Sequence, residues 1–154
     1  PAKFIYRAAN IESAFSSGVE VNATLEPLRR LTLMGGYTYA NAKDTSQPDV
    51  ETPLRRRPKH TGRLNLNYAL PVGLNMNLDV VFVGKRPDFI PGSKTKEMLF
   101  LPSYTTVNFG AAYAVGQSIS IFGKVTNLTD ENYQEVVGYP TLGRQIIGGA
   151  QVAF

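Results

Sequence analysis

Hydrophobic and polar residues alternate along most of this chain with a period of two, which is the pattern of a β-strand with one apolar face. The alternation is clearest from Leu74 to Phe82, where Leu, Met, Val and Phe alternate with Asn and Asp. No stretch keeps apolar residues at helical spacing. Further strands are predicted within Lys3–Ala9, Gly18–Leu25, Arg30–Tyr39, Arg63–Tyr68, Thr105–Tyr113, Ser118–Ile121 and Gln145–Phe154. The sequence therefore predicts an all-β fold of about eight antiparallel strands.

The predicted connections alternate between short turns and long loops. The short turns contain Pro or Gly, as hairpins require, and lie at Glu26–Arg29, Pro71–Gly73 and Val115–Gln117. The long loops are Asn41–Arg57, Pro87–Pro102 and Thr129–Thr141. This asymmetry indicates an up-and-down meander. Outer-membrane barrels have the same asymmetry, with short turns in the periplasm and long loops outside the cell.

Strand length and aromatic placement also favour part of a transmembrane β-barrel. Crossing the hydrocarbon layer takes about 9 to 11 tilted residues, and Leu74 to Phe82 is long enough. Aromatic residues lie near both predicted strand ends, where membrane barrels carry aromatic girdles. These residues are Tyr39, Phe82, Tyr68, Tyr113 and Phe154. Periodicity does not say which face points outward, so a soluble sandwich or lipocalin-like barrel is the alternative.

Composition narrows the functional classes. The 154 residues are 43% hydrophobic and 18% charged, and no segment approaches the roughly 18 apolar residues of a transmembrane helix. The absence of Cys excludes a disulfide scaffold and a thiolate metal site. His60 is the single histidine, which argues against a multi-histidine metal site or a Ser/His/Asp triad. A net charge of +4 does not indicate a polyanion-binding protein.

Several short motifs follow one another in a characteristic order. They are Gly18-Val19-Glu20, Tyr37-Thr38-Tyr39, Leu54 to His60, Leu101-Pro102-Ser103-Tyr104 with Val107-Asn108, Val125 to Tyr133, Gly138-Tyr139 and Gly143-Arg144, before a terminal strand ending in Phe154. From Ser13 onward this set resembles the C-terminal barrel of TonB-dependent outer-membrane receptors, which transport siderophores, haem and vitamin B12. Thr129 departs from the family, which often has an aromatic residue there. Pro53 to Arg56 and Tyr133 to Arg144 look most like the vitamin B12 transporters.

The resemblance implies a bacterial outer-membrane protein that takes part in TonB-energised import of a scarce metal chelate, without enzymatic activity or a cofactor of its own. Such barrels have about 22 strands around a plug domain, so residues 1–154 would be a C-terminal barrel segment with the plug absent. The implied partners are membrane lipid and lipopolysaccharide, the plug and TonB, the barrel assembly machinery and a small-molecule chelate. A complete small eight-stranded barrel with a structural or adhesive role is the alternative, although the small polar-face residues favour a wide lumen.

Charged and aromatic residues near the long loops are the candidates for contact with ligand or plug. They are Arg55, Arg57, His60, Arg63, Arg86, Phe89, Tyr133, Tyr139 and Arg144. Asp88, between Arg86 and Phe89, is a further candidate for contact with substrate. Arginine suits carboxylate and catecholate oxygens. The alternatives are a solvated loop base, contact with lipopolysaccharide phosphates, interfacial aromatic anchors and a structural role for His60. The basic segment lacks stacking aromatics for nucleic acid, and Asp130, Glu131 and Glu135 lack the spacing of a calcium loop.

Gly149, Val152 and Phe154 resemble the terminal signal that the barrel assembly machinery recognises. A girdle role for Phe154 is compatible with this signal. We predict that Phe154→Ala in the full-length receptor lowers outer-membrane abundance, because the terminal aromatic residue would be lost from the signal. Heat-modifiable barrel on a gel measures this. Wild-type amounts of that species would refute the prediction.

Overall fold

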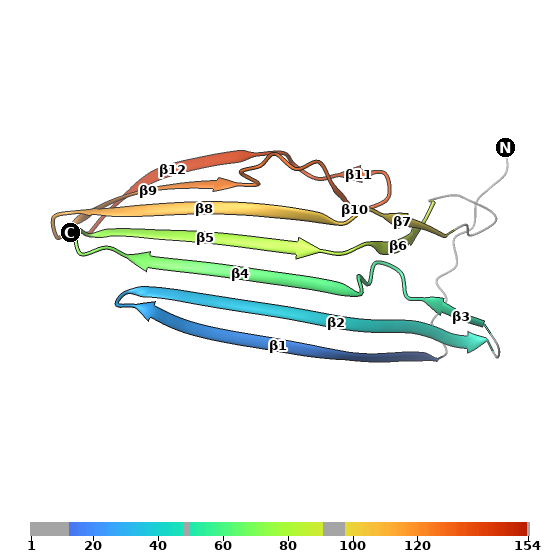
Figure 1. Ribbon diagram of the computed structural model, residues 1–154. Helices are drawn as coiled ribbons and strands as arrows, with labels where there is room; N and C mark the ends of the chain where they lie inside the picture. The colour runs from blue at the N-terminus through green and yellow to red at the C-terminus, as the bar shows by residue number, and fades with distance from the viewer. Residues whose placement is uncertain (1–12, 48–49, 91–97, 154) are drawn as a thin grey trace, which may run out of the picture.

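The computed structural model describes residues 13–47, 50–90 and 98–153, and its regular elements are all β-strands. The bounds are β1 (Ala14–Leu28), β2 (Leu31–Gln47), β3 (Val50–Pro53), β4 (His60–Ala69), β5 (Leu74–Val83), β6 (Arg86–Phe89), β7 (Met98–Leu101), β8 (Tyr104–Val115), β9 (Ile119–Thr126), β10 (Gln134–Val136), β11 (Tyr139–Pro140) and β12 (Gln145–Val152). The large sheet runs in the order β1-β2-β4-β5-β8-β9-β12, with β3 paired to β2 (Figure 1). Every neighbouring pair is antiparallel.

The predicted meander is confirmed, with short turns between β1 and β2, β4 and β5, and β8 and β9. The first turn is at Arg29 and Arg30, not at Glu26–Arg29, because β1 continues to Leu28, and the third is at 116–118. Positive φ angles at Arg30, Gly73 and Gly116 close these turns. The predicted strand Lys3–Ala9 and the terminal Phe154 lie outside the described residues.

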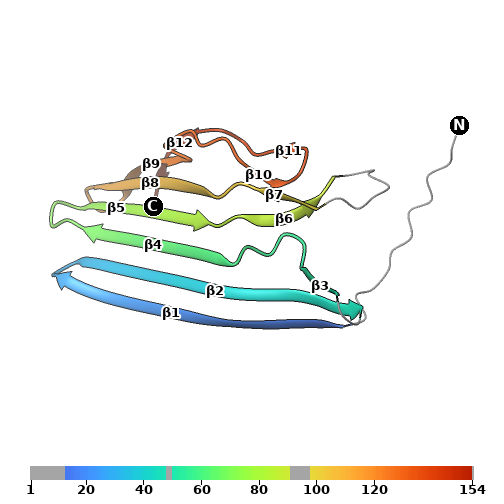
Figure 2. The same ribbon diagram turned by 45° about the vertical axis from the view of Figure 1, so that its right-hand side comes forward.

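The segments expected to be long loops contain additional strands. β2 continues past Tyr39 to Gln47 and pairs with β3, and two small hairpins, β6–β7 and β10–β11, lie beyond the same end of the large sheet (Figures 1 and 2). Pairing satisfies backbone hydrogen-bonding groups that an irregular loop would expose. Sequence periodicity did not reveal these hairpins because each of their strands has at most four residues.

The strand register sorts side chains into two opposite faces. One row of directly paired residues crosses all seven strands of the main path and is apolar throughout: Leu25, Leu33, Leu66, Leu78, Phe109, Val125 and Ile146. The neighbouring row lies on the other face and contains Thr24, Met34, Asn65, Asp79 and Asn108. The sheet therefore has one continuous apolar face and one mainly polar face.

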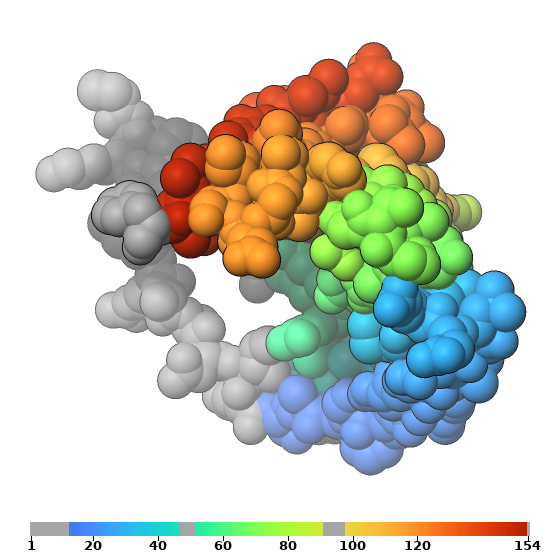
Figure 3. Space-filling view, turned by 90° about the vertical axis from the view of Figure 1, so that its left-hand side faces the viewer, coloured from blue at the N-terminus to red at the C-terminus, as the bar shows by residue number. Residues whose placement is uncertain are grey.

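No layer of the described chain covers the apolar face. Among the described residues only Leu101 and Tyr104 are buried hydrophobic residues, whereas Ile146 is 76% exposed. The sheet follows an arc from β1 to β12 around a hollow (Figure 3). In the described part of the chain, β1 and β12 do not pair with each other, so the sheet is an open curved wall. An apolar face of this size needs another apolar phase to cover it.

β1 and β2 pack so closely at Gly18 that a larger residue there is expected to destabilise the protein. A Cβ atom at this position would collide with the backbone carbonyl oxygen of Tyr39, whereas a Cβ at Gly35 meets nothing within 4 Å. We predict that Gly18→Ala lowers the free energy of unfolding of the protein by about 1–3 kcal/mol, because backbone cannot move aside as a flexible side chain can. Urea unfolding of the detergent-solubilised protein, followed by heat modifiability, measures the loss. Gly35→Ala is the matched control, and equal stability of the two variants would contradict the prediction.

Candidate functional site

The basic segment that precedes and enters β4 separates into three environments. Arg55 and Arg56 bind Asp88, at 3.2 Å for each ion pair. Arg63 binds Asp79 on the polar face of the sheet, with 2.8 Å between Nε and Oδ1. Arg57 and Lys59 have no ion pair within the part of the chain that the structure describes. Neighbouring basic residues in this segment therefore have different partners.

Asp88 connects three of the segments at the long-loop end. Its side chain is fully buried and accepts hydrogen bonds from the guanidinium groups of Arg55 and Arg56. The backbone N–H groups of Phe89 and Val137 also donate to it, at 2.9 and 3.1 Å. A buried carboxylate is tolerated only when such partners replace water. Asp88 thus joins the segment before β4 to β6 and to the β10–β11 hairpin.

The surroundings of Asp88 favour its charged form. Burial alone would raise the pKa of this carboxyl. The N–H groups of Val137 and Phe89 and the guanidinium groups of Arg56 and Arg55 outweigh burial and lower the pKa from 3.8 to about 2. The carboxylate is therefore ionised at neutral pH.

A second cluster stacks two aromatic rings and a cation. The rings of Tyr104 and Tyr133 are stacked with centroids 3.9 Å apart, and the guanidinium carbon of Arg86 lies 5.0 Å from the Tyr104 centroid. Arg86 also donates to the carbonyl oxygen of Gln134, and the Tyr104 hydroxyl donates to Glu135 at 3.2 Å. Arg86 is 3% exposed, and its Nη1 has no hydrogen-bond partner among the described residues. Arg86 and Tyr133 are thus joined through Tyr104.

The remaining loop candidates lie nearer the solvent. Arg55 stacks on Phe89, with 4.8 Å from its guanidinium carbon to the ring centroid. Tyr139 is 69% exposed at the start of β11. The backbone N–H of Arg144 donates to Asp130 at 2.7 Å, and the Arg144 guanidinium donates to the carbonyl oxygen of Leu128 at 3.5 Å. The structure brings Arg55 to Phe89 and Arg86 to Tyr133, but Tyr139 and Arg144 form no hydrogen bond or ring contact with each other in the described part of the chain.

A polar network runs across the middle of the polar face. Asp79 accepts from Arg63 and from the amides of Asn65 and Asn108, at 2.8, 3.4 and 3.3 Å. The Asn65 oxygen in turn accepts from Asn67 at 2.6 Å. Because Asp79 is only 9% exposed, its charge depends on these donors. His60 lies in register with Tyr39 on the opposite, apolar face.

Several residues of these networks were not among the sequence candidates. Asp79 and Asn108 lie inside strands, and Tyr104 begins β8 within one of the quoted motifs. A charged residue inside a strand of otherwise uncharged residues is a signal that would have found Asp79. Tyr104 carries no comparable signal, since its role depends on the distant Arg86 and Tyr133.

The terminal candidates lie at the β9–β12 edge. Gly149 pairs with Phe122, and a Cβ at Gly149 would meet the end of the Phe122 ring at 2.7 Å. Val152 is 59% exposed and pairs with Ile119. Their part in an assembly signal remains a prediction.

The described residues offer neither a metal site nor a membrane-spanning helix. They contain no group of three or more His, Cys, Asp or Glu placed to hold a metal ion. They also contain no helix that is long and apolar enough to span a membrane.

A curved antiparallel meander with an uncovered apolar face, a polar inner network and clustered loops at one end is the wall of a transmembrane β-barrel. A family model described as TonB dependent receptor-like, beta-barrel, matches residues 1–128. The chain belongs to this family of bacterial outer-membrane receptors, which confirms the resemblance seen in the sequence.

Similar proteins agree with the family. The chain is 31% identical over 149 residues to the iron-regulated outer membrane virulence protein of Vibrio cholerae, covering 94% of this chain and 22% of that protein. The structure is similar to the ferric-catecholate import receptor Fiu of E. coli, with a TM-score of 0.78 and 20% identity over 92% of this chain and 21% of that one. It is also similar to the ferripyoverdine receptor of Pseudomonas aeruginosa, with a TM-score of 0.76 and 18% identity. That match covers 90% of this chain and 19% of the receptor chain. The chain thus spans about a fifth of their length.

The depressed pKa of Asp88 predicts acid-sensitive loops. The ionised carboxylate stabilises the cluster fully above about pH 4, and this contribution, roughly 2 kcal/mol, is lost as the pH falls from about 4 to about 2. Asp88→Asn should therefore speed hydrogen exchange at the Val137 amide of the full-length receptor roughly thirtyfold at neutral pH, because that amide loses a charged acceptor. Mass spectrometry of deuterated peptides measures the rate.

Asp44→Asn is the control. The Asp44 carboxylate accepts from the backbone N–H of Ser46 within β2, and it is not part of the Asp88 cluster. Pepsin digestion of the wild-type receptor, normalised to digestion of an unfolded protein at the same pH, should cut near Leu54 and Phe89 faster at pH 2 than at pH 4. Equal exchange at Val137 in all three proteins would show that Asp88 does not hold the loops together.

Proposed function

We propose that this chain is the C-terminal part of the barrel of a receptor that imports a ferric siderophore through the outer membrane, with energy supplied through TonB. The Arg86, Tyr104 and Tyr133 cluster carries this proposal. Tyr104 has the same strand parity as Asn108, so it lies on the polar, lumen-side face at the long-loop end. A pocket of about 440 Å³ adjoins the cluster and is lined by Ser103, Tyr133 and Pro140, among others.

The chemistry of this region suits an anionic metal chelate. Ligand sites combine apolar or aromatic walls with a few convergent polar groups. Arginine and tyrosine supply both, and the buried Arg86 has a nitrogen without a protein partner among the described residues. The names of the similar proteins refer to iron regulation, ferric catecholate and ferripyoverdine, which supports a siderophore ahead of haem or a corrinoid. No covalent step is assigned to this chain.

We assign separate roles to the candidates. Tyr139 and Arg144 are exposed at the loop end and would contact the chelate directly. Arg55 and Phe89 hold the loops in place through their stacking contact, whereas Arg86 and Tyr133, joined through Tyr104, would form the wall of the chelate site beside the pocket. The polar network around Arg63 and Asp79 faces the space that a plug domain occupies in such receptors and would contact the plug. These roles follow the exposure and pairing of each side chain.

Uptake by the full-length receptor tests the proposal. Cells that lack other receptors are supplied with radiolabelled ferric catecholate, ferripyoverdine, haem or cyanocobalamin, with and without a functional tonB gene. We expect uptake of one siderophore class that disappears without TonB while surface binding remains. Tyr139→Ala should weaken binding of that siderophore roughly fivefold, because an aromatic contact is lost.

Tyr113→Ala, at the short-turn end of β8, is the matched control and should leave affinity unchanged once surface abundance is normalised. Uptake that persists without TonB would contradict the proposal that TonB supplies the energy for import. Uptake of haem or cyanocobalamin alone would contradict the siderophore assignment.

A further inference from the structure

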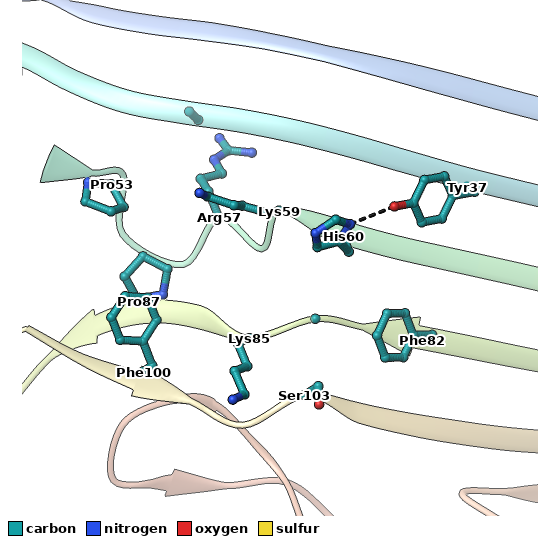
Figure 4. A pocket seen from close by; sticks show the side chains of 12 residues that line it. Tyr37, Pro53, Arg57, Lys59, His60, Phe82, Lys85, Pro87, Phe100 and Ser103 are labelled. Carbon is teal, nitrogen blue, oxygen red and sulfur yellow. Dashed lines mark hydrogen bonds between the residues drawn. The ribbon is translucent and has the colours of Figure 1, made fainter. Parts of the chain in front are cut away.

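Two pockets at the long-loop end of the sheet are held in place in different ways. The larger one encloses about 550 Å³, and Tyr37, His60 and Phe82 in its lining belong to β2, β4 and β5 (Figure 4). Strand register fixes these side chains, and the Tyr37 hydroxyl lies 2.6 Å from His60 Nδ1. The pocket beside Tyr133 has a different kind of wall, because residues 131–133 in its lining lie in the irregular segment between β9 and β10. This wall needs contacts other than strand pairing to keep its shape.

A buried asparagine directly after β9 holds the start of this wall. Asn127 is 6% exposed, and its side-chain oxygen accepts a hydrogen bond from the Glu131 N–H at 2.9 Å. The Asn127 side-chain amide donates to the Glu131 carbonyl oxygen at 3.0 Å. An amide side chain can make both bonds because it carries a donor and an acceptor, whereas an ionised carboxylate only accepts. One side chain therefore satisfies both backbone hydrogen-bonding groups of Glu131.

The backbone of the same turn is left-handed at two positions. Asn127 and Asp130 have φ angles of 50° and 55°. Asn and Asp enter this region more readily than other non-glycine residues, because their short side chains form local hydrogen bonds. The Asp130 N–H donates to the Asn127 carbonyl oxygen at 2.9 Å, which closes the turn. Residues kept in such conformations by their surroundings cluster at ligand-binding sites.

The turn is anchored to the sheet at β8. The Asn127 N–H donates to the side-chain oxygen of Asn108 at 2.9 Å. The Leu128 N–H donates to the Val107 carbonyl oxygen at 2.7 Å. Asn108 also donates to Asp79 at 3.3 Å, so the anchor belongs to the polar network of the strands. The turn therefore cannot shift without breaking hydrogen bonds to the barrel wall.

The other end of the pocket wall is held by the aromatic and cationic cluster. Arg86 donates to the carbonyl oxygen of Gln134. The Tyr133 ring stacks on that of Tyr104, with 3.9 Å between the centroids. Asn127 thus fixes the wall where it begins, and the cluster fixes it where it ends.

We propose that Asn127 is a positioning residue for the chelate pocket, which acts through the backbone of Glu131 and not by contact with the chelate. Its buried side chain keeps the wall from Glu131 to Gln134 in the conformation that receives the chelate. A preformed wall avoids the cost of ordering a loop on binding. The inference rests on the proposed function, because the pocket is the one assigned to the chelate.

Asn127→Gly in the full-length receptor tests this role. Glycine accepts the same φ angle and keeps the N–H that donates to Asn108, but it has no side chain to bridge Glu131. Without chelate, hydrogen exchange at the Glu131 amide should be roughly tenfold faster, because this amide loses its acceptor. Mass spectrometry of overlapping deuterated peptides measures the rate.

Chelate binding is the second measurement. Radiolabelled ferric catecholate and ferripyoverdine are both supplied to the wild type, and the chelate that it binds is then used for the variants. Asn127→Gly should weaken binding roughly tenfold, because binding must then order the wall.

Two control variants separate positioning from general effects. Thr129→Gly adds a glycine to the exposed part of the same turn without removing a side-chain hydrogen bond among the described residues. It should leave exchange at Glu131 and chelate affinity unchanged. Gly18→Ala lowers stability through the contact of β1 with β2 and should also leave affinity unchanged. Heat modifiability first confirms that each variant is folded.

Wild-type exchange at Glu131 in Asn127→Gly would overturn the inference, as would equal acceleration in Thr129→Gly. Faster exchange with wild-type affinity would also overturn it, since the bridge would then be structural only. A wild-type receptor that binds neither chelate would count against the proposed function, whereas the exchange rates would still decide whether Asn127 holds the pocket wall.

Discussion

The unbroken cross-strand register is the constraint on which the rest of this structure depends. A row from Leu25 to Ile146 stays in register through seven strands, so every second residue faces the same way throughout. A slip of one residue in any strand would move its Leu and Val side chains into the lumen and its Asn side chains into lipid. In a bilayer such an error is costly, because water is not available to hydrogen-bond displaced polar groups. Burial in a conventional core contributes little here, since the described residues contain almost none.

This register also explains how one short basic segment serves different purposes. The chain leaves the sheet at Pro53 and returns at His60, so the intervening side chains are free of the alternation. Arg55 and Arg56 can then reach Asp88, whose burial requires them. Once β4 resumes, alternation separates neighbouring functions again, with His60 on the apolar face and Arg63 on the polar one. The boundary between loop and strand therefore determines which cations meet carboxylates and which remain available.

The sequence predicted the fold well because alternation is a local property. Strands such as Leu74–Val83 and turns such as the one at Gly73 carry their own signal. The loop hairpins and the Asp88 cluster could not be predicted, since they depend on contacts between residues about 30 to 50 positions apart, such as Asp88 with Arg55 and Val137. Residue type selected Arg55, Phe89, Arg86 and Tyr133 as candidates, but only the structure shows which of them are joined. It also shows that His60 and Arg63, close in sequence, lie on opposite faces.

The distribution of compensated charge distinguishes the polar face of the wall from its long-loop end. On the polar face, Arg63 binds Asp79, which also accepts from the amides of Asn65 and Asn108, so the buried carboxylate is compensated within the sheet. At the loop end Arg86 is almost satisfied, with one nitrogen unpaired. Beside the long-loop end of the sheet, Arg57, Lys59 and Lys85 have no carboxylate partner among the described residues. Uncompensated cations weaken a fold through mutual repulsion unless an anion neutralises them. The wall therefore pairs the charges on its polar face internally, whereas the cations beside its long-loop end are left without a carboxylate among the described residues.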